Sequence, residues 1–254
     1  MKIVKATWEN RNLGRDAYEI TLDRKDLKDF DEILQEIRTQ DFAGAYVTLK
    51  MPVGDLKALH TLEDEGFRFM ENALSFKIRT DILTVPSQYE RLLQLFSYRV
   101  ISHDSDEWEN IIDTYISDDM YVSDRIYLDP YLPANASATR YKNWSKDLKK
   151  DENTRFLLFY KKDNNDPIGY SILKYNEKDN AFDGYVGGIF PHIKYFGVGA
   201  VLLLEPIIFS KENNVKNYYV HISSNNFPVL KLYSSFPCEC ISEQYVLRKM
   251  EKTK

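Results

Sequence analysis

A loop with two glycines is the stretch of this sequence best suited to bind an anion. It follows a strand-like stretch at 184–190, precedes an apolar helical stretch that runs to Phe209, and consists of Lys194, Tyr195, Phe196, Gly197, Val198, Gly199 and Ala200. The first N–H groups of a helix are unpaired and carry partial positive charge, and glycine lets a loop turn such groups outward. A pyrophosphate would fit there, although an ordinary turn before a buried helix would use the same glycines.

The loop differs from two common nucleotide-binding motifs. It is not G-x-G-x-x-G in a parallel β-α-β unit, and no G-K-[ST] follows it. A second stretch, NNFPVLKLYSSF, places Asn226 seven residues before Tyr233, on a short helix that begins directly after a strand. By helical periodicity alone, Tyr233 would be an aromatic residue on the buried face of that helix.

The two stretches together resemble the acyl-CoA N-acyltransferase superfamily called GNAT. Their pattern is K-x-x-G-x-G, helix, strand and N-x-x-x-x-x-x-Y, where the family usually has [QR]-x-x-G-x-[GA] and an Asn and a Tyr on the next helix. The resemblance covers roughly Tyr98 to Lys249 in strand order. Lys194 replaces the usual Gln or Arg, and Pro237 and Cys238 replace the Gly-Phe that usually follows the tyrosine.

This resemblance implies an acetyl-CoA-dependent N-acetyltransferase. The main chain of Ile189 and Phe190 would hold the pantetheine arm, and the loop from Lys194 to Ala200 would hold the pyrophosphate. Asn226 would contact the arm, and the hydroxyl of Tyr233 would face the sulfur as general acid. The general base stays open between His221, His192 and a carboxylate that acts through water. A non-catalytic acyl-CoA sensor is the second interpretation.

A looser resemblance concerns the acceptor amine. The stretches TWENRNLGRDAYEITL, ALHTLEDEGFRFMEN and DRIYLDPYLPANASATRYKNWSKDL look like the two-domain acetyltransferases that act on a dTDP-4-amino-dideoxysugar of the dTDP-fucosamine type. An aminosugar linked to a nucleotide is therefore the expected small-molecule partner, with an amino acid, a polyamine or a peptide amine as the alternative. The aromatic loop would supply the substrate contacts Tyr127, Asp129, Tyr131 and Tyr141, unless it only covers the joint between two modules.

The periodicities predict an α+β protein with a mixed sheet, in two units. The N-terminal module, residues 1–85, has strands at 2–9, 16–23, 45–50 and 67–79 and helices at 27–38 and 54–66. The GNAT domain, residues 86–254, has helices at 105–116, 137–148 and 227–235 beside the one that follows the glycine loop. Its strands are expected at 98–101, 154–162, 167–175, 181–190, 217–222, 238–242 and 245–249.

The N-terminal module also resembles the end of the second unit. Residues 45–79 and 218–249 both run strand, helix and then strands over similar lengths. Aligning them puts Asp55 at the place of Asn226 and Leu62 at the place of Tyr233, so the first module would be a degenerate GNAT half without acid or cofactor loop. Coincidence between common units is the other interpretation.

Composition limits the remaining possibilities. The chain has 254 residues and a net charge of −5, so no positive field exists to attract nucleic acid or anionic lipid. The N-terminus lacks the apolar core of a signal peptide, and no run of about 18 apolar residues occurs. We expect a cytoplasmic protein without membrane contact or bound metal, in which Cys238 and Cys240 pack as small apolar residues. The closing strands would allow a homodimer.

Overall fold

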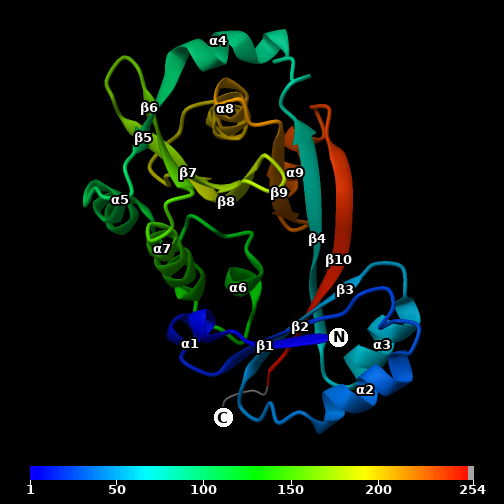
Figure 1. Ribbon diagram of the computed structural model, residues 1–254. Helices are drawn as coiled ribbons and strands as arrows, with labels where there is room; N and C mark the ends of the chain where they lie inside the picture. Colours follow the sequence, from blue (N-terminus) through cyan, green and yellow to red (C-terminus); the bar gives the residue numbers. More distant parts are fainter. Residues whose placement is uncertain (251–254) are drawn as a thin grey trace.

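Ten strands form one mixed sheet in the computed structural model, which describes residues 1–250 (Figure 1). In sheet order they are β1 (Lys2–Lys5), β2 (Ala17–Thr21), β3 (Tyr46–Pro52), β10 (Glu239–Lys249), β4 (Arg68–Arg79), β9 (Asn217–Ser223), β8 (Ala181–Ile189), β7 (Pro167–Asn176), β6 (Thr154–Lys161) and β5 (Phe96–Ile101). The expected α+β class with a mixed sheet is confirmed.

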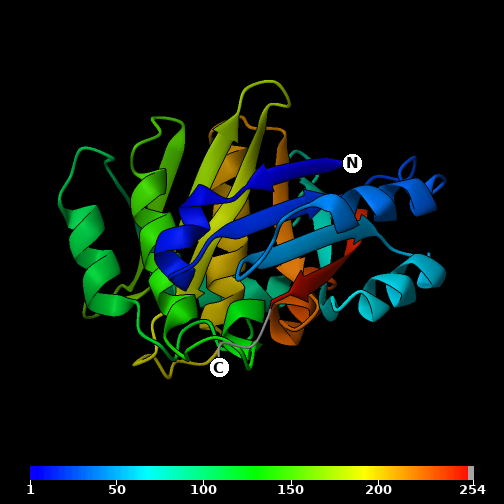
Figure 2. The same cartoon turned by 90° about the horizontal axis from the view of Figure 1, so that it is seen from below.

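Helices cover both faces of this sheet. They are α1 (Thr7–Leu13), α2 (Phe30–Thr39), α3 (Leu56–Asp64), α4 (Ser87–Leu95), α5 (Glu107–Tyr115), α6 (Arg125–Leu128), α7 (Ala136–Leu148), α8 (Val198–Glu212) and α9 (Phe227–Tyr233). The sheet curves, and α6 and α7 lie inside the curve, whereas α8 and α4 lie outside it (Figures 1 and 2).

The strand order has an internal two-fold pattern. From β1 through β2 and β3 to β10, the pairings are antiparallel, parallel and antiparallel. The same sequence of pairings runs from β7 through β8 and β9 to β4. The helix caps agree, because Asp55 accepts from the N–H of Ala58 at the start of α3 as Asn226 accepts from the N–H of Val229 at the start of α9. This agreement favours an internal repeat over coincidence.

The two halves exchange a strand. Each closing strand lies inside the other half, since β10 pairs with β3 and β4 pairs with β9, while β4 and β10 also pair with each other. In Figure 1 these two long strands run side by side through the middle of the molecule. The boundary expected near residue 85 falls between β4 and α4, and the sheet continues across it.

Alternation along the strands separates the core from a polar face. Val47, Leu49 and Met51 of β3 belong to the apolar cluster under α2 and α3, so the intervening Thr48 and Lys50 point to the opposite face. In the second half, the corresponding apolar side chains pack under α8 and α9, and a third cluster lies under α5 and α7. The inner face of the curve is therefore lined by polar side chains near the middle of the sheet.

Several elements differ from the sequence-based prediction. The strand expected at 2–9 ends at Lys5 and is followed by helix α1, and helices α4 and α6 were not predicted. The two closing strands are one strand, β10, with an irregularity between Cys240 and Ser242. Cys238 precedes this strand and is half-buried, Cys240 is exposed, and both are free thiols.

Candidate functional site

The glycine loop has the conformation that a helix N-terminus open to an anion requires. Gly197 is the N-cap of α8 and has φ +82°, in the left-handed region that favours glycine. Gly199 lies in the first turn, where a Cβ would stand 3.5 Å from Leu232, an ordinary contact. Phe196 is almost fully exposed at the tip of the loop. The N–H groups of Ala200 and Val201 donate to the carbonyl of Gly197, so the amides of Val198 and Gly199 are the ones that can receive an acidic group.

Strands β8 and β9 separate next to this loop. Their parallel pairing runs from Ala181 and Asn217 to Gly184 and Val220, yet β8 continues to Ile189 and β9 to Ser223. Past the last pair, the two strands diverge. The space between their diverging edges is called the fork below. Such a fork leaves main-chain donors and acceptors available for an extended ligand.

Ile189 and Phe190, the two residues expected to hold the pantetheine arm, differ in whether their main-chain groups are free to bind a ligand. Phe190 donates its N–H to Ile168 and accepts from Ile193, and its ring is fully buried. Because successive N–H groups of a strand point to opposite edges, the N–H of Ile189 faces away from β7, into the fork. Ile189 is also partly exposed. The main chain of Ile189, and not that of Phe190, is therefore available to a ligand.

Tyr233 lies in the core beneath the fork. Its side chain is 1% exposed, and its hydroxyl lies near that of Tyr218 on β9. The Tyr218 hydroxyl in turn fills the place where a Cβ on Gly184 would stand, at the last pair between β8 and β9. Burial raises the pKa of Tyr233 well above its ordinary value, so the hydroxyl keeps its proton. No sequence pattern indicated Tyr218 as its neighbour.

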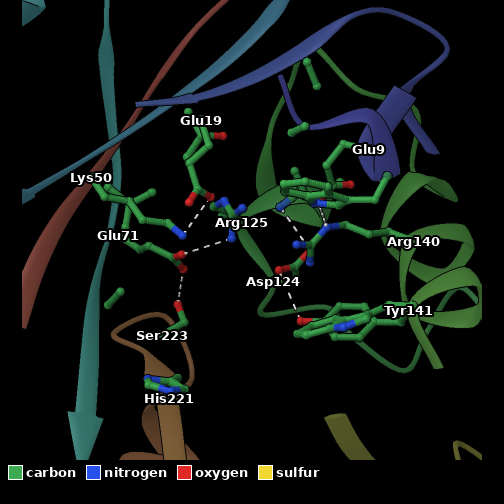
Figure 3. Close-up of a pocket in the computed structure, with 18 of the residues that line it drawn as sticks. Glu9, Glu19, Lys50, Glu71, Asp124, Arg125, Arg140, Tyr141, His221 and Ser223 are labelled. Atoms are coloured by element: carbon green, nitrogen blue, oxygen red, sulfur yellow. Dashed lines mark hydrogen bonds and ion pairs between the residues drawn. The ribbon is translucent and has the colours of Figure 1, made fainter. Parts of the chain in front are cut away.

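A cavity of about 390 Å³ lies on the inner face of the sheet, on the other side of the same fork (Figure 3). Gly184, His221 and Ser223 line it at the fork. Strands β2, β3 and β4 contribute Glu19, Lys50 and Glu71 from the N-terminal half, whereas α1, α6 and α7 cover it with Trp8, Glu9, Arg125, Arg140, Tyr141 and Trp144. The N-terminal and the C-terminal parts of the sheet therefore both build this cavity.

Charged side chains in the cavity wall form pairs. Lys50 Nζ lies 2.8 Å from Glu19 Oε2, and Arg140 Nε lies 2.7 Å from Glu9 Oε1. Burial is the largest single influence on the pKa of Glu9 and raises it, but the charge of Arg140 together with hydrogen bonds from Asn12 and Arg140 lowers the pKa overall. Arg140 also lies over the rings of Tyr141 and Trp144, with its guanidinium carbon 5.7 and 5.4 Å from their centroids.

Glu71 occupies the centre of this wall. It is 5% exposed, accepts a hydrogen bond from Ser223 at the end of β9, and lies 3.5 Å from Nη1 of Arg125. Arg125 is the first residue of α6, and its Nε is buried without a hydrogen-bond partner. The preceding Asp124 accepts from the N–H of Ile126, from Ser137 and from Tyr141.

Only one of the four expected substrate residues lines the cavity. Tyr141 contributes its ring, stacked on Tyr121 with centroids 3.7 Å apart, and its hydroxyl lies 3.4 Å from Asp124. Tyr127 is half-buried and lies outside the lining. Asp129 forms an ion pair with Arg248, and the ring of Tyr131 covers the guanidinium of that arginine.

Asp129 is a structural residue, which corrects the expectation that it contacts substrate. Its two carboxylate oxygens each accept from the guanidinium of Arg248 at 2.8 Å, and it also accepts from Tyr46 and from the N–H of Tyr131. The Asp129 side chain is fully buried. The ring of Tyr131 covers Arg248, 4.2 Å from the guanidinium carbon. A carboxylate with all these donors has no lone pair directed toward the cavity.

The two candidate histidines lie in different surroundings. His221 lines the cavity, and its Nδ1 lies 2.8 Å from the hydroxyl of Ser75 on β4. Burial lowers the pKa of His221 against the opposing charge of Asp183, which favours a neutral ring. His192 is outside the cavity and stacks on Phe190. His221 is therefore the better placed of the two to accept a proton from a ligand.

A second hollow, of about 450 Å³, lies beside the first. The two share Trp8, Glu9, Arg140 and Trp144. Trp8 is half-exposed, so one face of an indole ring is available there for stacking. A ligand longer than the inner cavity could extend into this second hollow.

Two searches of residues 1–250 bear on other kinds of site. In this part of the chain, no group of three or more His, Cys, Asp or Glu side chains is arranged to hold a metal ion. None of its helices combines the length and apolar character that crossing a bilayer requires.

Comparisons by sequence find no matching family and no matching curated protein. Comparison of folds does find neighbours. A GCN5-related N-acetyltransferase from Sphaerobacter thermophilus is 13% identical with TM-score 0.58, covering 99% of this chain and 76% of that one. A conserved protein of unknown function from Staphylococcus epidermidis is 13% identical with TM-score 0.57, covering 96% and 88%.

A third neighbour is a domain of a larger protein. It is the glucosamine N-acetyltransferase region of a fungal multi-domain GH3 β-N-acetylglucosaminidase, 14% identical with TM-score 0.57, covering 97% of this chain and 30% of that one. At such identities the comparisons establish the fold. The protein therefore has the fold of the GCN5-related N-acetyltransferases, as the glycine loop and the Asn226 and Tyr233 spacing predicted.

Proposed function

We propose that the protein is an acetyl-CoA-dependent N-acetyltransferase that acts on the primary amine of a small molecule. One observation carries the proposal. The fork between β8 and β9 has the buried Tyr233 and Tyr218 hydroxyls on one side and the polar cavity on the other, with Gly184 at the point where both meet. A thioester in the fork would thus have the proton donor Tyr233 on one side and the cavity for the amine substrate on the other.

The residues present fit the cofactor. The open N-terminus of α8 suits the pyrophosphate, because unpaired N–H groups and the helix dipole both favour negative charge there. The N–H of Ile189 and the edges of the fork suit an extended arm. When bound, acetyl-CoA supplies an activated thioester that an amine can attack.

The side chains around the fork then have distinct tasks. His221 takes the proton from the incoming ammonium group, since its lowered pKa keeps the ring neutral. In the tautomer in which Nδ1–H donates to Ser75, Nε2 carries the accepting lone pair. Tyr233 donates its proton to the leaving thiolate, and its burial beside Tyr218 keeps that proton in place until it is needed.

A nucleotide-linked aminosugar is the acceptor that the sequence resemblance favours. The name of the fungal neighbour also points to amino sugars. The rings of Tyr141 and Trp144 in the inner cavity and of Trp8 between the two hollows support it, since sugars and bases stack on aromatic faces. Asp129, one of the contacts that favoured an aminosugar, is buried in the ion pair with Arg248. Amino acids, polyamines and peptide amines therefore belong in the same test.

The test is release of free CoA thiol from acetyl-CoA in the presence of each amine in turn. The panel contains a dTDP-aminosugar, glucosamine, an amino acid, spermidine and a short peptide. Turnover with any of them, confirmed by mass spectrometry of the N-acetylated product, supports the proposal. Tight binding of acetyl-CoA without turnover would favour the non-catalytic sensor, and absence of binding would leave only the fold.

A further inference from the structure

The inner cavity holds one arginine whose hydrogen-bonding capacity is largely unused. Arg125 has five N–H donors, and within residues 1–250 its one carboxylate neighbour within 4 Å is Glu71, at 3.5 Å. Its Nε is buried without a partner. In Figure 3 the guanidinium lies between Glu19 and Glu71, in the middle of the cavity. Buried donors are nearly always paired in folded proteins, so this one indicates an acceptor atom that a ligand brings.

Three other cations, the cavity residues Lys50 and Arg140 and the more distant Arg248, are better satisfied. Lys50 is 2.8 Å from Glu19, Arg140 is 2.7 Å from Glu9 and stacks on Trp144, and Arg248 is held by Asp129 through two hydrogen bonds. These three are therefore explained by contacts within the protein. The contacts of Arg125 within the protein do not explain it in this way. The helix α6 to which Arg125 belongs is itself held at its start by the N-cap Asp124.

The charges around Arg125 also suit an amine. The lining contains the acids Glu9, Glu19, Glu71 and Asp124 and the bases Lys50, Arg125 and Arg140, which leaves an excess of one negative charge if His221 is neutral. A ligand that carries only an acidic group would be repelled. A ligand with an ammonium group beside an acidic group would satisfy both Arg125 and the negative excess.

We propose that the acceptor is an amine that also carries an acidic group, a carboxylate or a phosphate, and that Arg125 binds this group. The amine then lies toward Ser223 and His221 at the fork, with Glu71 between it and Arg125. The planar guanidinium can present Nε and Nη to the two oxygens of one acidic group. This inference rests on the proposed function for the transfer step, but the recognition of the acidic group can be measured without it.

The experiment compares amines in matched pairs on the full chain. Each pair has an acidic and a neutral member: γ-aminobutyrate with n-butylamine for a carboxylate, and glucosamine 6-phosphate with glucosamine for a phosphate. The readout is the ratio of kcat/KM for the acidic member to that for the neutral member. We expect a ratio of at least tenfold in the wild type for one pair, and the pair concerned identifies the carboxylate or the phosphate.

The variant Arg125→Gln should reduce that ratio to near one, and Arg125→Lys should leave an intermediate ratio because an ammonium keeps the charge without the planar fork. Arg79→Gln is the matched control, since Arg79 is exposed and pairs with Asp81 far from the lining. It should keep the wild-type ratio. Circular dichroism melting of each variant shows whether it is folded.

The outcomes that overturn the inference are a wild-type ratio near one in both pairs, or an undiminished ratio in Arg125→Gln. If no amine is acetylated, the proposed function fails, and calorimetric titration of the same four amines decides the inference by itself. Tighter binding of the acidic member, lost in Arg125→Gln, then supports it. Equal binding of both members, or no binding of either, contradicts it.

Discussion

The hydroxyl groups of Tyr218 and Tyr233 lie near each other beneath the point where β8 and β9 separate. The pair is fully buried, and a side chain on Gly184 would collide with the Tyr218 hydroxyl. Burial raises the pKa of both tyrosines. Both hydroxyls are therefore protonated at neutral pH, which is the state that a general acid must have.

Replacing the acid should separate chemistry from binding. Tyr233→Phe is expected to lower kcat roughly 100- to 10,000-fold, the usual contribution of a general acid, and to leave the calorimetric Kd for acetyl-CoA within a few-fold. Loss of the buried hydroxyl should change stability by only about 1 kcal/mol. Tyr218→Phe is the control, since it removes the neighbouring buried hydroxyl and keeps that of Tyr233. Equal kcat values for Tyr233→Phe and the wild type would rule out the proposed role.

The ion pair between Asp129 and Arg248 should contribute to the stability of the folded protein and not to substrate binding. Asp129→Asn leaves a buried guanidinium without its partner charge and is expected to cost about 3–5 kcal/mol in urea unfolding. Asp163→Asn, which breaks the exposed pair with Lys161, should cost less than about 1 kcal/mol. If folded Asp129→Asn instead raised the KM for the acceptor at unchanged stability, Asp129 would be a substrate contact after all.

Glu205 on α8 should make stability depend on pH. Burial, and then the neighbouring Glu212, raise its pKa from the ordinary 4.5 to about 7. The unfolded chain therefore releases this proton at lower pH than the folded protein, so stability falls as the pH rises from about 4.5 to 7, by up to about 3 kcal/mol. Glu205→Gln should flatten the profile over this window in urea titrations. The exposed Glu177→Gln should retain the wild-type slope, and equal slopes in all three proteins would refute the assignment.

Local patterns predicted most of the fold. The alternation in β3 and β4 and the periodicity of α2 and α3 depend on neighbouring residues, so the sequence carries them directly. Helix α1 was mistaken for the continuation of a strand, because its seven residues are too few to establish a period. The exchange of β4 and β10 between the halves was beyond prediction, since strand pairing depends on contacts between distant segments.

The candidate site was predicted unevenly for the same reason. The glycine loop and Tyr233 could be found because their motif is local in the sequence. Glu71 and Arg125 were missed, since they lie 54 positions apart in the sequence and meet only through the curvature of the sheet. Asp129 was misread because a sequence does not show that Arg248, near the far end of the chain, neutralises it. A charged residue can be assigned to ligand binding or to an internal ion pair only after its neighbours in the folded structure are known.

The proposed function requires that the N-terminus of α8 holds the cofactor, and Gly199 offers the most direct test of this requirement. Unlike Gly197, it has no left-handed conformation, and a Cβ there makes only ordinary contacts. Glu in the first turn of a helix is favourable for folding, so Gly199→Glu should weaken binding by charge and not by unfolding. Gly199→Gln is the control of equal size.

The measurement is calorimetric titration of the wild type and both variants with acetyl-CoA. We predict saturable binding by the wild type and at least tenfold weaker binding by Gly199→Glu than by Gly199→Gln, equivalent to about 1.4 kcal/mol or more. Absence of binding by the wild type, or equal Kd values for the two variants, would contradict a cofactor site at the glycine loop.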